Sequence, residues 1–333
     1  MNKRLVSILQ YVIFLGGGLF LVWWQFKSMT EPEKKEFYAA IQNADYRIIF
    51  PVAIMSILSH ISRSLRWRLL MEPLGYKPKL SNLFAVTMIG YLANSAIPRL
   101  GELLKCTFLA KYEKLKVDKL VGTIIVERSF DLICYAVFIG ITILIQIQLI
   151  GGYFKRKWEV MPSSAGSNLL LKFVIIFLVL FTIWKLMKWL STKKPDNKII
   201  KAIHNFISGV AEGFKTIKTL KQRKLFLFHT IFIWAMYLGQ IYVGFKGMGD
   251  TSSLPIGAAF SVLTLATLSM IVTPGGIGSF PIFVMQTLLL YGIHAPLGKA
   301  FGWVMWGVST GLMITIGLIS LLIIPSLNKQ TRK

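Results

Sequence analysis

Asn94-Ser-Ala-Ile-Pro-Arg-Leu-Gly-Glu102 is a stretch in which proline and glycine interrupt an otherwise apolar sequence, and Thr273-Pro-Gly-Gly-Ile-Gly-Ser279 is another. Proline lacks a backbone donor and glycine relaxes the helical constraint, so each stretch predicts a break in a helix. Lipid cannot satisfy the backbone groups that such a break frees, and they are tolerated only against protein or a water-filled cavity. Broken segments of this kind are typical of the substrate site in membrane transporters.

The composition around these breaks is that of an integral membrane protein. Of the 333 residues, 54% are hydrophobic, and the mean hydropathy is +0.61. The formal net charge of +24 does not indicate nucleic-acid binding, because the basic residues lie between apolar segments rather than on a soluble basic face. The two cysteines have no CxxC spacing, the histidines have no paired ligand spacing and no Walker A sequence occurs. We therefore expect no metal, no cofactor and no ATP-driven pump.

Apolar segments that approach the length of a membrane span, about 20 residues, recur along the whole chain. The candidates are 5–26, 47–61, 81–97, 98–110, 120–150, 169–190, 225–246, 254–273, 277–294 and 300–324. We expect an all-α polytopic membrane protein that forms a single domain over residues 1–333. About six full spans and two re-entrant helical hairpins account best for these segments.

Lysine and arginine assign the sides of the membrane. They are concentrated in the N-terminus, in the loops 62–79 and 111–119, in 185–224 and in the C-terminal tail, which together hold 25 basic and 5 acidic residues. The remaining loops hold 10 basic and 6 acidic residues. Basic loops stay on the cytoplasmic side, so we expect an inner-membrane protein with both termini in the cytoplasm. Helically spaced apolar residues within 185–224 predict a cytoplasmic amphipathic connector.

The same assignment predicts two hairpins that enter from opposite sides. Because the loops 62–79 and 111–119 are both cytoplasmic, the hairpin near 80–110 must enter and leave on that side. The hairpin near 254–294 would begin and end outside, although its arms are also long enough for two full spans. The first half of the chain, 1–150, and the second half, 225–325, would then form an inverted repeat, in which the substrate site lies between the broken elements.

Six ionisable residues fall inside the apolar segments: Arg99, Glu102, Lys105, Glu127, Arg128 and Asp131. Intramembrane charges are costly and are usually paired or line a cavity. One interpretation is structural, with salt bridges that hold the first hairpin against the helix 120–150. In the other, Arg99, Lys105 or Arg128 binds a lipid phosphate. A third hypothesis is a proton relay through Glu127 and Asp131.

Three motifs occur in order along the chain: Ile97-Pro-Arg-Leu-Gly-Glu-Leu-Leu-Lys105, Val126-Glu-Arg-Ser-Phe-Asp-Leu132 and Thr273-Pro-Gly-Gly-Ile-Gly278. Together they resemble the transmembrane region of lysylphosphatidylglycerol synthase, a family of flippase-like membrane proteins, and the resemblance covers about 5–325. Full-length synthases of this family add a soluble aminoacyl-transferase domain. The sequence to Lys333 has no such domain, so the resemblance implies the flippase part and no synthase activity. The family often has an acidic residue after the third motif, where this chain has Pro281.

We therefore expect flippase-like movement of an anionic phospholipid or lipid-linked molecule between leaflets. In this hypothesis cationic side chains hold the phosphate, while Asn94 and the backbone of the second break donate hydrogen bonds. The predicted substrate contacts are Asn94, Pro98, Arg99, Gly101, Glu102, Lys105, Glu127, Arg128, Asp131, Thr273, Pro274, Gly275, Gly276 and Gly278. The alternatives are a component of a lipid-modifying aminoacyl transferase and a membrane scaffold that transports nothing. An oligomer is compatible with each of these functions.

Overall fold

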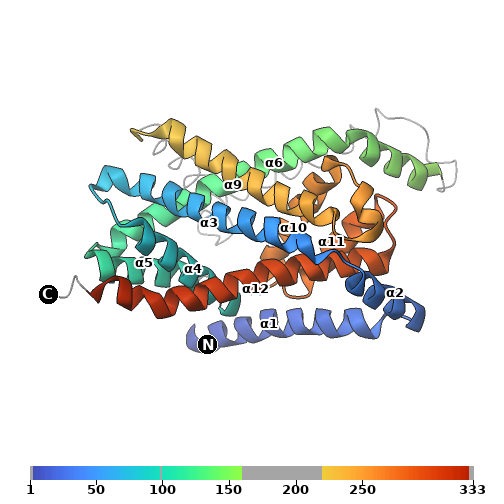
Figure 1. Ribbon diagram of the computed structural model, residues 1–333, viewed down its shortest axis with the longest axis horizontal. Helices are drawn as coiled ribbons and strands as arrows, with labels where there is room; N and C mark the ends of the chain where they lie inside the picture. The colour runs from blue at the N-terminus through green and yellow to red at the C-terminus, as the bar shows by residue number, and fades with distance from the viewer. Residues whose placement is uncertain (1–2, 98–99, 160–219, 330–333) are drawn as a thin grey trace, which may run out of the picture.

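The computed structural model describes residues 3–97, 100–159 and 220–329, and every regular element in these ranges is a helix (Figure 1). The α-helices are α1 (Lys3–Lys27), α2 (Glu31–Gln42), α3 (Ile49–Met71), α4 (Leu80–Ala96), α5 (Leu100–Glu113), α6 (Val117–Glu159), α9 (Arg223–Phe245), α10 (Ile256–Val272), α11 (Ser279–Leu289) and α12 (Ala295–Leu327). Short 3-10 turns lie at Tyr46–Ile48, Glu72–Leu74, Gly249–Ser253 and Pro274–Gly276. The all-α prediction is confirmed. The predicted segment 169–190 and most of the predicted connector 185–224 fall outside the described residues.

Four of the described helical stretches are long and apolar enough to cross a membrane: Tyr46–Leu74, Val117–Gln146, Arg223–Phe245 and Ala295–Leu327. Helices α4, α5, α10 and α11 are shorter, with 17, 14, 17 and 11 residues. At 1.5 Å per residue, α11 covers only about 17 Å, well short of the hydrocarbon core. Two full spans over 254–294 are therefore not formed by these helices.

Helix α3 is longer than the sequence predicts. We expected a span over 47–61 and a cytoplasmic loop over 62–79, but α3 continues to Met71 and its last turns are buried. Arg63 and Arg66 lie in this continuation, with 9% and 0% of their surfaces exposed. Their charges are paired inside the protein, so they do not end the helix. The loop that joins α3 to α4 is correspondingly short.

The first break forms a tight hairpin between α4 and α5. The carbonyl oxygen of Gly90 packs against Gly101, where an added Cβ would lie only 1.8 Å from that oxygen. The side-chain oxygen of Asn94 accepts a hydrogen bond from the backbone N–H of Gly101, at 2.8 Å. Side chains larger than hydrogen would separate the two helices, so this close approach requires glycine. Pro98 and Arg99, which follow Ile97 in the chain, lie outside the described residues.

The second break joins α10 to α11 through three glycines with positive φ: Gly275 at 61°, Gly276 at 72° and Gly278 at 71°. Its carbonyl groups have partners from elsewhere in the fold. The indole N–H of Trp306 donates to Gly275 O at 2.8 Å, and the side-chain amide of Gln25 donates to Gly278 O at 2.8 Å. The predicted break in the helix is present. Side chains of α12 and α1 donate hydrogen bonds to two of the backbone carbonyl groups that the break leaves without helical partners.

Corresponding helices of the two halves make corresponding contacts. A long helix, a broken pair and a second long helix occur in each half, as α3, α4–α5, α6 and as α9, α10–α11, α12. Helix α3 packs on α9, while α4 packs on α12 and α10 packs on α6. The two broken pairs lie toward opposite ends of the molecule (Figure 1). Their breaks meet, since a Cβ added at Gly275 would lie 3.9 Å from Ser95 Cα.

The ends of the molecule differ in charge. The connections α3–α4 and α5–α6, the start of α9 and the end of α12 gather at one end (Figure 1). Basic residues at this end are Arg68, Lys77, Lys79, Lys111, Lys114, Lys116, Lys119, Lys221, Arg223, Lys224 and Lys329. Helix α2 and the connections α9–α10 and α11–α12 lie at the opposite end, where acidic and basic residues are mixed. The loops that the sequence assigns to one side are thus close together in space.

Candidate functional site

A cluster of buried charges joins α3, α5 and α6 beneath the first break. Glu127 on α6 lies at its centre, with 2% of its surface exposed. Lys105 Nζ is 3.2 Å from Glu127 Oε2, while Arg63 Nη1 and Arg66 Nη2 are 3.6 Å and 3.7 Å from Glu127 Oε1. One carboxylate therefore faces three cations, which offset the cost of removing it from water.

Asp131, one helical turn beyond Glu127, attaches α3 to α6. Its two carboxylate oxygens bind different arginines: Oδ2 accepts from Arg63 Nη1 at 3.2 Å, and Oδ1 pairs with Arg66 Nη2. Helix α9 completes this arrangement, because Arg66 donates to Thr230 Oγ1 at 3.2 Å and Arg63 donates to Tyr237 Oη at 3.4 Å. Both guanidinium groups are held by several partners at once, so they are parts of a rigid frame.

Lys105 is fixed by a tryptophan as well as by Glu127. Its ammonium lies 3.8 Å from the centre of the Trp67 ring, and the indole N–H of Trp67 donates to Thr123 Oγ1 at 2.9 Å. A cation over an aromatic face is attracted to the negative π surface, more strongly where water is excluded. Trp67 is fully buried, so this contact holds Lys105 in place on the inner face of α5.

Arg128 and Glu102 form the outer pair of the cluster. Arg128 Nε lies 3.0 Å from Glu102 Oε1, and 45% and 35% of the two side chains are exposed. Two salt bridges therefore join α5 to α6, Lys105–Glu127 inside and Arg128–Glu102 outside; the structural interpretation expected buried bridges here, and only the first of these is buried. The outer pair is the more accessible of the two.

The described cluster carries an excess of positive charge. The six residues singled out in the sequence carry no net charge, but Arg63 and Arg66 join the cluster, while Arg99 lies outside the described residues. In the described residues, four cations face three carboxylates. The cations are Arg63, Arg66, Lys105 and Arg128, and the carboxylates are Glu102, Glu127 and Asp131. A site whose described part carries more positive than negative charge favours an anion.

A small hollow opens beside this cluster. Its lining comes from α3, α4, α5 and α6, and comprises Arg63, Thr87, Gly90, Tyr91, Asn94, Gly101, Glu102, Lys105, Ile124 and Arg128. Two buried polar atoms of the lining residues, Thr87 Oγ1 and Arg63 Nε, have no hydrogen-bond partner among the described residues. Buried polar groups are normally paired, so these two atoms are available to water or to a ligand.

The structure brings together most of the residues predicted from the first two motifs. Asn94, Gly101, Glu102, Lys105 and Arg128 line the hollow. Glu127 and Asp131 lie behind them, paired with cations. The predicted residues of the second break, Thr273, Pro274, Gly275, Gly276 and Gly278, are not among the lining residues; they form the neighbouring break that meets Ser95.

Sequence reasoning missed Arg63 and Arg66, together with Thr87 and Tyr91. The two arginines were assigned to a loop, although a spacing of three places them on one face of a helix. This spacing, which comes soon after an apolar run, is the pattern from which the longer α3 could have been predicted. Thr87 and Tyr91 are four apart on α4 and offered no charge to mark them.

Pro281 occupies the position at which the resembled family often has an acidic residue. It lies in the first turn of α11 and is buried. An added Cβ at Gly302 of α12 would lie 2.7 Å from Pro281 Cα, so the two helices are in close contact here. This position therefore serves helix packing in the present chain, and contributes no charge.

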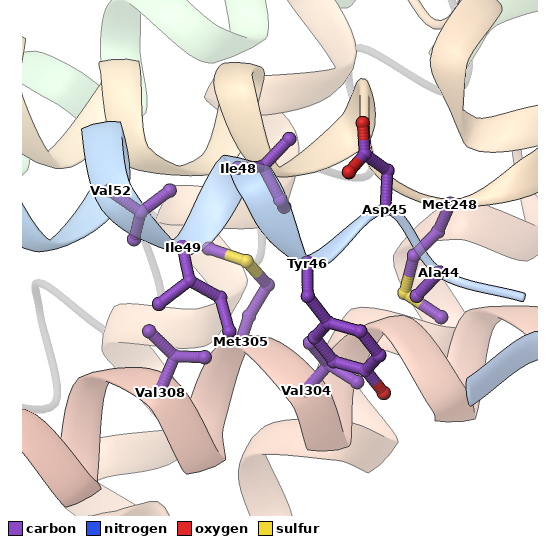
Figure 2. A pocket seen from close by; sticks show the side chains of 10 residues that line it. All are labelled: Ala44, Asp45, Tyr46, Ile48, Ile49, Val52, Met248, Val304, Met305 and Val308. Atoms are coloured by element: carbon purple, nitrogen blue, oxygen red, sulfur yellow. The ribbon is translucent and has the colours of Figure 1, made fainter. Parts of the chain in front are cut away.

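A second small hollow lies at the opposite end between the α2–α3 connection and α12 (Figure 2). It is lined mainly by apolar side chains such as Ile49, Val304 and Met305. Its one carboxylate, Asp45, accepts a hydrogen bond from the backbone N–H of Arg47 at 3.0 Å and so caps the turn. Nothing in this lining offers a cation to an anionic substrate.

Comparison with known proteins identifies the family. Residues 7–317 match the family described as the lysylphosphatidylglycerol synthase TM region. The UPF0104 membrane protein MJ1595 of Methanocaldococcus jannaschii is 23% identical over 301 residues, which cover 85% of each chain. No solved structure matches. The chain therefore belongs to the lysylphosphatidylglycerol synthase TM-region family of integral membrane proteins.

Proposed function

We propose that this protein moves an anionic phospholipid, or another lipid-linked phosphate, between the leaflets of the inner membrane. The observation that carries the proposal is the unmatched positive charge beside the hollow under the first break. In the proposed mechanism, Arg128 and Lys105 attract the phosphate, and Thr87 and Asn94 offer it polar contacts. The acyl chains remain in the bilayer, so only the headgroup has to enter.

An inverted repeat supplies the route in this proposal. The matching contacts of α3 with α9, α4 with α12 and α10 with α6 support a two-fold relation between the halves. With the basic end in the cytoplasm, the α4–α5 hairpin enters from inside and the α10–α11 hairpin from outside. Rocking of one half against the other would expose the meeting point of the two breaks to each leaflet in turn. The second break, from Thr273 to Gly278, would then contact the headgroup late in its passage.

Neither rival function is favoured by a specific observation. A transferase needs groups that activate a nucleophile, but Glu127 and Asp131 are each bound by at least two cations. A scaffold requires the buried charges only to pair with one another. The excess cation, the hollow and the unpartnered Thr87 hydroxyl go beyond that requirement. Without an ATP site, the proposed movement follows a gradient.

The test is leaflet exchange in proteoliposomes. Purified protein is reconstituted with fluorescent phosphatidylglycerol, phosphatidic acid or phosphatidylcholine, and bleaching of the outer leaflet by dithionite reports exchange. We expect faster exchange of the two anionic lipids than in protein-free vesicles, and little for phosphatidylcholine. The Lys105→Gln variant should lose exchange, while Lys111→Gln, an exposed lysine on the same helix, should retain it. No exchange of any anionic lipid by the folded wild type would refute the proposal.

A further inference from the structure

The Arg128–Glu102 pair lies on an exposed, largely apolar surface of α5 and α6. Ile125 and Leu132 share the face of α6 that carries Arg128, and they are 55% and 36% exposed. Leu103, next to Glu102 on α5, is 58% exposed. The pair thus interrupts an apolar surface of the kind that contacts acyl chains, between the hollow on one side and the bilayer on the other.

The depth of this pair makes its exposure unusual. Arg128 lies 11 residues beyond Val117, the first residue of α6, which is about 16 Å along the helix axis. In the topology proposed above, with the α5–α6 connection in the cytoplasm, this distance would place the pair inside the hydrocarbon core, which is about 30 Å thick. A partly exposed ion pair at such a depth is costly unless water or a polar headgroup reaches it. A lateral entrance for a lipid headgroup at Arg128 would meet this requirement.

Arg128 also differs from the other cations in how it is held. Arg63, Arg66 and Lys105 are each bound by Glu127, and the two arginines are bound again by Asp131. Across the part of the chain that the structure describes, Glu102 is the carboxylate within 4.0 Å of Arg128. A single, half-exposed partner is easier to exchange than one buried among several.

Building on the proposed function, we propose that Glu102 is an internal counter-ion, which occupies the position at Arg128 that the phosphate of the lipid takes. A phosphate oxygen replaces the Glu102 carboxylate at the guanidinium, and the buried, unpartnered hydroxyl of Thr87 lines the same hollow. Four described cations face three carboxylates, so the charge of the described site favours an additional anion. Glu102 thereby keeps Arg128 neutralised whenever no lipid is bound.

Binding of short-chain phosphatidylglycerol to the purified protein in detergent tests this exchange. Removing the competitor in Glu102→Gln should tighten binding by about fivefold, because a partly exposed pair contributes that order of free energy. Arg128→Gln should weaken binding by about tenfold or more. Adding Glu102→Gln to Arg128→Gln should change nothing further, since the two residues act through one contact. A merely structural Glu102 would give unchanged or weaker binding in Glu102→Gln, and either result overturns the inference.

Two further measurements distinguish failure of this inference from failure of the proposed function. Inorganic phosphate at equal concentration should bind much more weakly than phosphatidylglycerol. Equal affinity would show that the ligand is free phosphate and would overturn the lipid entrance. If the wild type exchanges lipid between leaflets while Glu102→Gln leaves affinity unchanged, the inference fails and the proposed function stands. If the folded wild type neither binds nor exchanges phosphatidylglycerol, both fail.

Discussion

Gly101 on α5 contacts the backbone of Gly90 on α4 so closely that an added Cβ would lie 1.8 Å from the Gly90 carbonyl oxygen. The same atom would lie 2.7 Å from Asn94 Cγ. This contact sets the separation of the two helices at the first break, and hence the position of Glu102 and Lys105, which follow Gly101 on α5. The charged site depends on a pair of glycines for its geometry.

The Gly101→Ala variant should therefore lose stability. The methyl group meets backbone, which cannot move aside as a flexible side chain would, so we expect a loss of about 2–3 kcal/mol in the free energy of unfolding. The matched control is Gly122→Ala in α6, where an added Cβ has nothing within 4 Å. This control should be neutral or stabilising by up to about 1 kcal/mol. Equilibrium unfolding in mixed micelles measures both, and equal effects would contradict the close-contact account.

Neutralising the two bridging glutamates should have unequal effects. Glu127→Gln removes the charge that faces three buried cations and should cost about 3 kcal/mol or more. Glu102→Gln removes one partner of a single, partly exposed cation and should therefore cost less than Glu127→Gln. Thermal unfolding of the two variants gives the comparison, and a larger loss for Glu102→Gln would contradict the assigned burial.

Arg66→Lys should be poorly tolerated although the charge is kept. The guanidinium binds Asp131 through one nitrogen and Thr230 through another, and it is completely buried. An ammonium cannot reproduce this fork, so we expect a loss of about 2 kcal/mol. Arg68→Lys, on the same helix, replaces an arginine that forms no ion pair with a described residue and should be nearly silent. The unfolding midpoints of the two variants test this prediction. Equal shifts would contradict the view that the two guanidinium contacts of Arg66 stabilise the fold.

Trp306→Phe should destabilise the backbone conformation of the second break. The substitution keeps an aromatic ring but deletes the N–H that donates to Gly275 O, so the carbonyl at the break loses its partner. We expect a cost of about 1–3 kcal/mol, together with slower leaflet exchange. Trp303→Phe serves as the control on the same helix. Hydrogen exchange of the 273–279 backbone should rise in the first variant only, and unchanged protection in both would contradict this role.

Much of the arrangement at the breaks follows from the sequence, because Pro98 and the glycines near 101 and 275 have strong local effects on a helix. The end of α3 could not be predicted in the same way. Hydropathy alone assigns Arg63 and Arg66 the full free-energy cost of burying a charge, and so predicts that the helix ends before them. In the structure Glu127, Asp131 and Thr230 offset that cost, and these residues belong to helices distant in sequence. The positive excess of the site depends on these two arginines. Because the sequence places them in a loop, it predicts a cluster with no net charge.

The second break was also only partly predictable. Its glycines predict an irregular backbone, but the sequence could not show that Trp306 and Gln25 would come to lie against it. Those contacts connect residues far apart in the chain, and local propensity carries no information about them. The predicted matching of the two halves remains a prediction that transport experiments have to test.

The central claim is that the cation-rich cluster under the first break binds the phosphate of a lipid in transit. The most direct measurement is the initial rate of phosphatidylglycerol exchange in proteoliposomes that contain equal amounts of folded wild type, Arg128→Gln or Lys111→Gln protein. The account predicts that Arg128→Gln lowers the rate by about tenfold or more while Lys111→Gln leaves it unchanged. Equal rates for all three proteins would contradict it.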